Sequence, residues 1–113
     1  LSSRRQRQMC IRDRKLTMQD NTEIINELWE IIKEREKCGD ENSYTYSTLK
    51  KGIKKASQKV GEEAAELIVA SLAETKKEII NESADLIFHW LLLLKLTNVD
   101  PNEVFQELKN RRN

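Results

Sequence analysis

Apolar and polar residues alternate with the period of an α-helix along most of this chain. Four isoleucines, one leucine and one tryptophan recur at helical spacing over residues 21–35, with Glu and Lys between them, which predicts an amphipathic helix. Residues 36–42, which include Gly39, break the pattern and are expected to form a loop. The hydroxyl residues from Ser43 onward predict the cap of a short helix that Gly52 ends.

A longer helix is predicted over residues 53–72. The residues expected to form its buried stripe are Ala56, Val60, Ala64, Leu67 and Ile68. Gly61 lies inside this helix, where a glycine costs about 1 kcal/mol relative to alanine. Its presence suggests that another backbone or a ligand approaches the helix closely at this position.

The next helix is expected to begin after Thr75. Thr75 and Glu78 have the spacing of a capping box, and the helical pattern continues to about Leu96. Residues 86–94 are apolar nearly all round, so that one neighbouring helix cannot cover them. We therefore expect a homodimer, or a higher multiple, assembled through the segment Leu86–Leu96.

A last short helix is expected near the C-terminus. Asp100 is its predicted N-cap, Pro101 takes the first helical position, and Glu103 closes a second capping box. The chain of 113 residues contains a single proline, and its glycines are few. The sequence thus predicts the all-α fold class, with four to five helices in one small antiparallel helical bundle.

The first residues differ from the rest of the chain. Residues 1–15 carry six basic residues and one acidic residue, with no amphipathic period. They resemble translated sequencing-adapter sequence, so residues 1–17 are expected to be a non-native or disordered leader before a native start near Met18. From Leu16 onward acidic residues outnumber basic ones, which argues against nucleic acid as a partner of the folded domain.

The cysteines and the longest apolar run bound the cellular setting. Cys10 and Cys38 offer neither a disulfide framework nor a CxxC metal pair, which fits a reducing cytoplasm. The apolar run Leu86–Leu94 is interrupted by His89 and is much shorter than the roughly 20 residues that span a bilayer. We expect a soluble, cytoplasmic protein with no membrane partner.

Acidic residues gather on the two longest predicted helices. They are Glu62, Glu63, Glu66, Glu82 and Asp85. Residues three and four apart share a helix face, so an antiparallel hairpin would bring the two groups together. Each close pair of like charges would then cost about 1 to 4 kcal/mol, which a cation removes, and hard oxygen ligands suit Mg²⁺ or Mn²⁺. His89 continues the acidic stripe, although a histidine in a leucine run is more often a satisfied core residue than a site residue.

Lysines and hydroxyl residues lie near these carboxylates in the pattern. Lys55 and Lys59 precede Glu63 by two turns and one turn on the same face. This arrangement suits a phosphate chain with its metal, but it equally suits a solvated face with lysine–glutamate pairs. Ser43 and Thr45 could cap a helix only, or could cap it and also contact phosphate.

Several of these segments together form a specific motif set. The set consists of Ser43-Tyr44-Thr45, Leu49, Gly52, Lys59–Glu66, Glu82–Leu86, His89 and Val99-Asp100-Pro101. It resembles the phosphoribosyl-ATP pyrophosphatase family, which catalyses the second step of histidine biosynthesis, over roughly residues 22–112. The spacings of Glu63 with Glu66 and of Glu82 with Asp85 resemble the wider superfamily of all-α nucleoside triphosphate pyrophosphatases. Phe88 and Trp90 stand where the family often has tyrosine and leucine, which does not affect the acidic site.

The resemblance implies a function for residues 18–113. The expected reaction is the Mg²⁺-dependent hydrolysis of phosphoribosyl-ATP to phosphoribosyl-AMP and pyrophosphate, with Mn²⁺ as an alternative ion. The implied metal ligands are Glu63, Glu66, Glu82 and Asp85, the catalytic carboxylates are Glu62 and Glu63, and the phosphate-binding residues are Ser43, Thr45, Lys55 and Lys59. Glu62 would be either a further ligand or the base that receives the proton of water. His89 would lie outside the direct metal ligands and support them. In many organisms such a domain is fused to a phosphoribosyl-AMP cyclohydrolase, which is therefore a candidate fusion or pairing partner.

Two other functions are compatible with parts of the pattern. One is a housekeeping pyrophosphatase of the same superfamily that acts on noncanonical nucleoside triphosphates. The other is a non-catalytic helical dimerisation module, in which the acidic patches are merely solvated. A dimerisation module would leave unexplained why the carboxylates gather over two helices while the leucines gather elsewhere.

Overall fold

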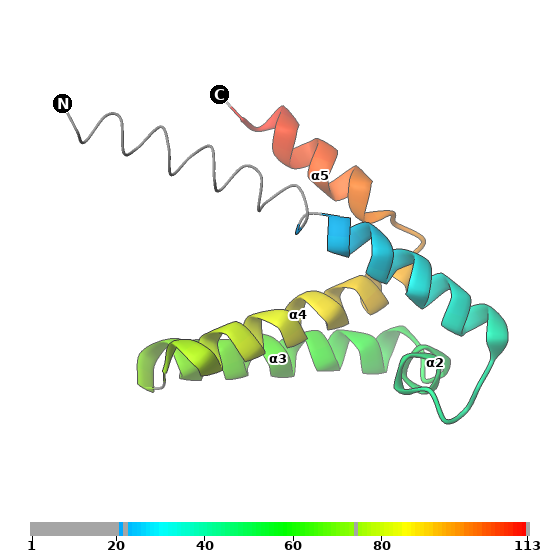
Figure 1. The fold of residues 1–113 in the computed structure, drawn as a ribbon, viewed down its shortest axis with the longest axis horizontal. Coiled ribbons are helices and arrows are strands. Elements are labelled where there is room, and N and C mark those ends of the chain that lie inside the picture. The colour runs from blue at the N-terminus through cyan, green and yellow to red at the C-terminus, as the bar shows by residue number, and fades with distance from the viewer. Residues whose placement is uncertain (1–20, 22, 74, 113) are drawn as a thin grey trace. The chain divides into compact units, whose positions relative to one another are not determined.

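The computed structural model describes residues 21, 23–73 and 75–112, and all regular secondary structure in them is α-helical, as predicted. A first helix includes residues 23–38. It is followed by α2 (Tyr44–Lys50), α3 (Ile53–Ala73), α4 (Lys76–Leu96) and α5 (Pro101–Asn110) (Figure 1). The chain divides into two compact units between Glu30 and Ile31, and α2 to α5 all belong to the second. The expectations for residues 1–17 lie outside the described residues.

The predicted caps are confirmed. The side chain of Ser43 accepts a hydrogen bond of 3.2 Å from the backbone N–H of Tyr46 and so starts α2. Thr75 caps α4 by accepting from the backbone N–H of Glu78. Asp100 and Glu103 form the complete capping box of α5. Each polar side chain thus satisfies a backbone donor that the helix itself leaves unpaired.

The first helix is longer than predicted. Residues 36–38 were expected in a loop, but they continue the helix as far as Cys38. Glu36 and Lys37 are good helix formers, and the helix ends only at Gly39, whose φ of +68° is the left-handed conformation of a helix C-terminus. Glu36 then pairs with Lys95 of α4 at 3.0 Å.

The two longest helices form the predicted antiparallel hairpin. Figure 1 shows α3 and α4 side by side, and two residues separate them in the chain. The buried residues of α3 are Ala56, Glu63 and Ala70, which are seven positions apart and therefore share one face. Ile68, predicted in the buried stripe, is 59% exposed. The buried face of α3 therefore does not include Ile68, and it does include the carboxylate of Glu63.

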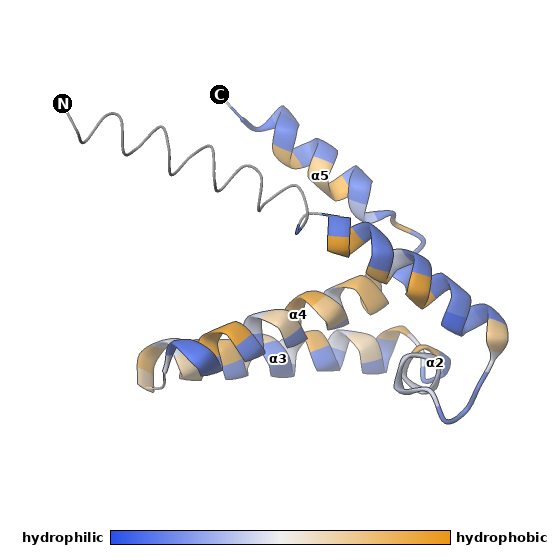
Figure 2. Cartoon of the chain, viewed as in Figure 1, coloured by the Kyte–Doolittle hydropathy of each residue, from blue (hydrophilic) through white to orange (hydrophobic). Residues whose placement is uncertain are grey.

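Three leucines of α4 are buried within the chain. Leu91 and Leu92 are fully buried and Leu94 nearly so, and the ring of Trp90 lies 6.3 Å from that of Phe105 in α5. Figure 2 shows hydrophobic residues along α4. In the same segment Ile87 remains 43% exposed and Leu86, Leu93 and Leu96 are half-buried, so the assembly expected through Leu86–Leu96 stays a prediction. None of the described helices has the length and apolar content needed to cross a membrane.

Exposed apolar side chains lie elsewhere on the hairpin. They are Ile53, Ile68, Val69 and Leu72 of α3 and Ile80 and Ile87 of α4. Gly61 also faces open space, because a Cβ at this position would have no neighbouring atom within 4 Å. The predicted close approach of another backbone to Gly61 is therefore wrong within this chain.

Candidate active site

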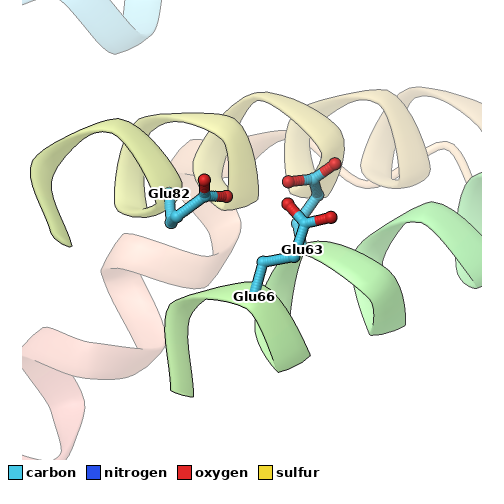
Figure 3. A group of neighbouring side chains, drawn as sticks. All are labelled: Glu63, Glu66 and Glu82. Carbon is cyan, nitrogen blue, oxygen red and sulfur yellow. The ribbon is translucent and has the colours of Figure 1, made fainter. Parts of the chain in front are cut away.

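Three carboxylates from the two hairpin helices converge. Glu63 and Glu66 extend from α3 and Glu82 from α4, and one oxygen of each lies within 4.8 Å of the others (Figure 3). Glu63 and Glu66 are three positions apart on one face, and the antiparallel pairing places Glu82 opposite them. Asp85 lies outside this group, and its side chain is exposed. We call Glu63, Glu66 and Glu82 the carboxylate cluster.

Burial and neighbouring carboxylates raise the pKa values of Glu63 and Glu82 in the carboxylate cluster. Burial, followed by the neighbouring Glu66, raises the pKa of Glu63. A hydrogen bond with Glu66, with further contributions from desolvation and from the charges of Glu66, Asp85 and Glu63, raises the pKa of Glu82 to about 7. One buried oxygen each of Glu63 and Glu82 has no hydrogen-bond partner. Such oxygens are costly unless a proton or a cation satisfies them.

The carboxylate cluster has the chemistry of a divalent cation site. Carboxylate oxygens are the hard donors that Mg²⁺ and Mn²⁺ prefer. Three of them converge here, and two unpartnered buried oxygens belong to the same residues. The residues present therefore fit a divalent cation.

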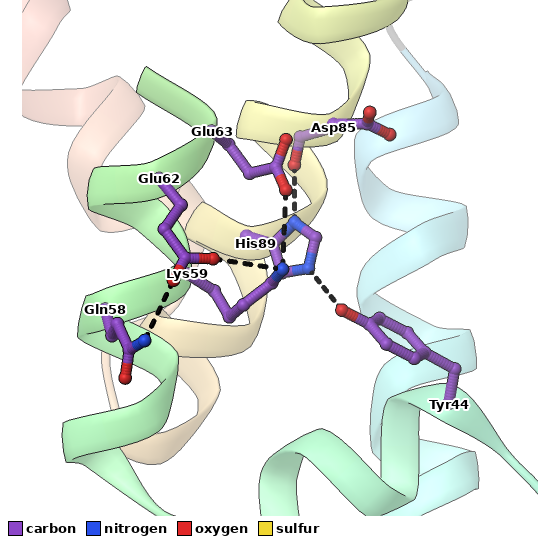
Figure 4. Close-up of polar contacts among 7 residues, drawn as sticks. All are labelled: Tyr44, Gln58, Lys59, Glu62, Glu63, Asp85 and His89. Atoms are coloured by element: carbon purple, nitrogen blue, oxygen red, sulfur yellow. Dashed lines mark hydrogen bonds and ion pairs between the residues drawn. The ribbon is translucent and has the colours of Figure 1, made fainter. Parts of the chain in front are cut away.

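Lys59 connects the carboxylate cluster to its neighbour Glu62. Its Nζ lies 3.3 Å from a carboxylate oxygen of Glu62 and 3.6 Å from one of Glu63 (Figure 4). The hydrogen bond to Glu62 raises the pKa of Lys59 above its usual value. Hydrogen bonds from Gln58 and Lys59 lower the pKa of Glu62. Glu62 therefore remains outside the carboxylate cluster as a paired anion, with Lys59 as the cationic edge of the site.

The other predicted site residues take different places. Ser43 is buried as the N-cap of α2, so its predicted capping role is confirmed. Its contact with phosphate stays a prediction. Thr45 follows in the first turn of α2, and Lys55 lies one turn before Lys59 on α3. His89 is buried at 6% exposure, and both of its ring nitrogens take part in hydrogen bonds.

Sequence reasoning gave no role to Tyr44. Its hydroxyl oxygen lies 2.8 Å from Nε2 of His89, which joins α2 to α4 (Figure 4). The available signal was its position between Ser43 and Thr45 in the resemblance motif. That position did not indicate a partner 45 residues further along the chain.

The raised pKa of Glu82 predicts an inverted pH dependence for the metal-free protein. The folded-state pKa of about 7 lies above the usual value of 4.5, so the folded state binds more protons than the unfolded state between these values. Stability should therefore fall as pH rises from about 5 to about 7.5. Thermal melts in a chelating buffer check this, and Glu82→Gln should remove much of the fall. A parent and a variant with the same pH dependence would contradict the prediction.

The hairpin and its side chains define a class of protein: an all-α chain with a candidate divalent cation site and a lysine edge that suits phosphate. The family model for phosphoribosyl-ATP pyrophosphohydrolase matches residues 25–112 of the chain. The chain therefore belongs to the phosphoribosyl-ATP pyrophosphohydrolase family.

Curated relatives agree with this assignment. A phosphoribosyl-ATP pyrophosphatase of Geobacter metallireducens is 42% identical over 94 residues, which are 83% of this chain and 86% of the relative. That of Sulfolobus acidocaldarius is 45% identical over 94 residues, covering 83% of this chain and 97% of the relative. That of Saccharolobus solfataricus is 46% identical over 92 residues, which are 81% of this chain and 98% of the relative. The match thus extends over nearly the whole length of these enzymes.

Proposed function

We propose that this protein hydrolyses phosphoribosyl-ATP to phosphoribosyl-AMP and pyrophosphate, as an enzyme of histidine biosynthesis that depends on Mg²⁺ or Mn²⁺. Family membership over residues 25–112 supports the reaction. The observation that carries the metal dependence is the carboxylate cluster, in which one buried oxygen each of Glu63 and Glu82 has no hydrogen-bond partner. A divalent cation bound there would offset the charge of the triphosphate and lower the pKa of a bound water.

The ligand set of this proposal includes one residue outside the carboxylate cluster. Glu63, Glu66 and Glu82 are the proposed ligands on geometric grounds. Asp85 is proposed as the fourth because it follows Glu82 by three positions on α4 and its charge contributes to the raised pKa of Glu63 and Glu82. Four carboxylates would supply up to four oxygen ligands to the cation from this chain.

Lys55, Lys59, Ser43 and Thr45 are the proposed contacts for the phosphates of the substrate. Lys59 pairs with Glu62 and Glu63. A phosphate oxygen that binds Lys59 would weaken its hydrogen bond to Glu62, and the pKa of Glu62 would then rise, while the hydrogen bond from Gln58 would remain. Glu62 would become a better proton acceptor at the moment when substrate is bound. We propose Glu62 as a catalytic carboxylate on this basis, and Glu63 as the second because it also lies beside Lys59, at 3.6 Å.

A substrate comparison tests the proposed function. Phosphoribosyl-ATP, dUTP and a set of modified nucleoside triphosphates are assayed at equal concentration with Mg²⁺. The family assignment predicts a clear preference in kcat/KM for phosphoribosyl-ATP. A clear preference for the noncanonical triphosphates would instead favour the housekeeping pyrophosphatase and overturn the proposal.

We also propose that the enzyme is a homodimer. Its interface is placed on the exposed apolar side chains of the hairpin, which include Ile87 of the segment Leu86–Leu96, and not on the buried Leu91, Leu92 and Leu94. Ile68 and Leu72 are 59% and 83% exposed and lie one turn apart on α3. Covering several such side chains at about 1.5 to 3 kcal/mol each would stabilise the pair.

Light scattering at micromolar concentration checks the dimer. The parent should have twice the mass of one chain, and Leu72→Glu should shift it toward the single chain because a charge would enter the apolar interface. Leu108→Glu, at an equally apolar residue of α5 that is 59% exposed, is the matched control and should remain dimeric. A parent that is a stable monomer would refute this part of the proposal.

A further inference from the structure

Tyr44 holds the buried His89 through a hydrogen bond between two helices. His89 Nδ1 lies 2.8 Å from the backbone carbonyl oxygen of Asp85, and His89 Nε2 lies 2.8 Å from the hydroxyl oxygen of Tyr44. A carbonyl oxygen can only accept, so Nδ1 carries the proton of the neutral ring. Nε2 of the neutral ring is then an acceptor, and the hydroxyl of Tyr44 donates to it.

The ring of Tyr44 is also placed by aromatic neighbours. It stacks near Phe88 with centroids 6.4 Å apart and meets His89 edge-on at 5.9 Å. The residue is nevertheless 55% exposed, so its ring is not a core side chain. Its hydroxyl is the part with a specific partner, and that partner is buried.

This hydrogen-bond chain joins the two halves of the proposed site. Tyr44 is the first residue of α2, between Ser43 and Thr45, which are the proposed phosphate contacts. Its bond to His89 continues to the backbone of Asp85, in the acidic segment of α4 (Figure 4). The hydrogen bond of the Tyr44 hydroxyl therefore helps to set the distance between the start of α2 and the carboxylates of α4.

We propose that Tyr44 is a positioning residue of the hydrolytic site, whose hydroxyl fixes the orientation of His89 and the placement of the start of α2 against the carboxylates of α4. The inference rests on the proposed function for its catalytic consequence. Its structural half, the orientation of His89, can be measured without substrate or metal. Misplacement of reacting groups by about 1 Å can cost about 100-fold in rate, so the loss of one such tether is expected to be visible in kcat.

The first test observes the imidazole directly. His89 is the single histidine of the chain, so the ¹⁵N–¹H correlation spectrum of the imidazole of the untagged protein contains one ring system. The parent should show the tautomer with the proton on Nδ1. Tyr44→Phe keeps the ring and removes the hydroxyl, and it should shift the Nε2 signal. Tyr46→Phe, on the same short helix, is the matched control and should leave both nitrogen signals unchanged.

The second test separates positioning from folding. Tyr44→Phe should lower kcat about tenfold while its far-ultraviolet circular dichroism and its dimer mass match the parent, and Tyr46→Phe should retain the parental kcat. An Nε2 signal that does not move in Tyr44→Phe would overturn the inference, as would a moved signal with unchanged kcat. A parent that prefers another substrate would reject the proposed function, while the spectra would still decide the orientation of His89.

Discussion

Glu66→Gln should reduce the hydrolysis of phosphoribosyl-ATP by at least about 10²- to 10³-fold. Glu66 interacts with both other carboxylates of the cluster, since it contributes to the raised pKa of Glu63 and to that of Glu82. The substitution keeps the shape of the side chain and removes its charge, so that the carboxylate cluster holds a cation less tightly. Electrostatic stabilisation of developing charge is usually the largest single catalytic contribution, which sets the size of the expected loss.

The control for this variant is a carboxylate that is outside the site. Glu107 of α5 is 55% exposed at its side chain and pairs with Arg111 at 3.0 Å. Glu107→Gln removes the same charge and should leave kcat and KM within about twofold of the parent, because exposed ion pairs contribute little. Initial rates of pyrophosphate release at saturating Mg²⁺ provide the comparison. Similar losses in the two variants would mean that net charge, and not the carboxylate cluster, determines activity.

Leu91→Ala should lower the free energy of unfolding by about 2 to 5 kcal/mol. Leu91 is fully buried in α4, and truncation of a buried leucine removes its transfer free energy and leaves a cavity. For a domain of this size the melting temperature should fall by about 10 °C or more. Thermal and denaturant melts measure the change.

The same variant separates stability from metal binding. The carboxylates lie in the N-terminal half of α4 and on α3, whereas Leu91 lies in the C-terminal half of α4. Leu91→Ala should therefore retain the stabilisation that Mg²⁺ gives the parent. Leu108→Ala, at an exposed leucine, is the control and should change stability by less than about 0.5 kcal/mol. A parental melting temperature for Leu91→Ala would show that the core does not depend on this residue.

Local sequence signals predicted the helices and their caps because the required groups are close together in the chain. The side chain of Ser43 reaches a backbone N–H three residues on, and Asp100 and Glu103 satisfy each other within one turn. The end of the first helix was misplaced because the residues before Gly39 favour a helix as strongly as those before them.

Helix periodicity was sufficient to predict part of the site. The spacing of Glu63 and Glu66, with Glu82 on a partner helix, was sufficient to expect a meeting of carboxylates. Periodicity did not give the rotation of α3, which leaves Ile68 exposed and buries Glu63, because rotation depends on how two helices fit. It also could not reveal the bond between Tyr44 and His89, which joins residues far apart in the chain.

Thermal melting with and without Mg²⁺ is the most direct test that the carboxylate cluster is a metal site. Mg²⁺ at about 100 times its dissociation constant should stabilise the parent by about 2.7 kcal/mol. Without Mg²⁺, Glu66→Gln should be as stable as the parent or slightly more stable, because charge repulsion with its neighbours is relieved, and added Mg²⁺ should no longer stabilise it. Glu107→Gln should keep the full Mg²⁺ effect. If Mg²⁺ raises the melting temperature of Glu66→Gln as much as that of the parent, the cation is not bound by these carboxylates.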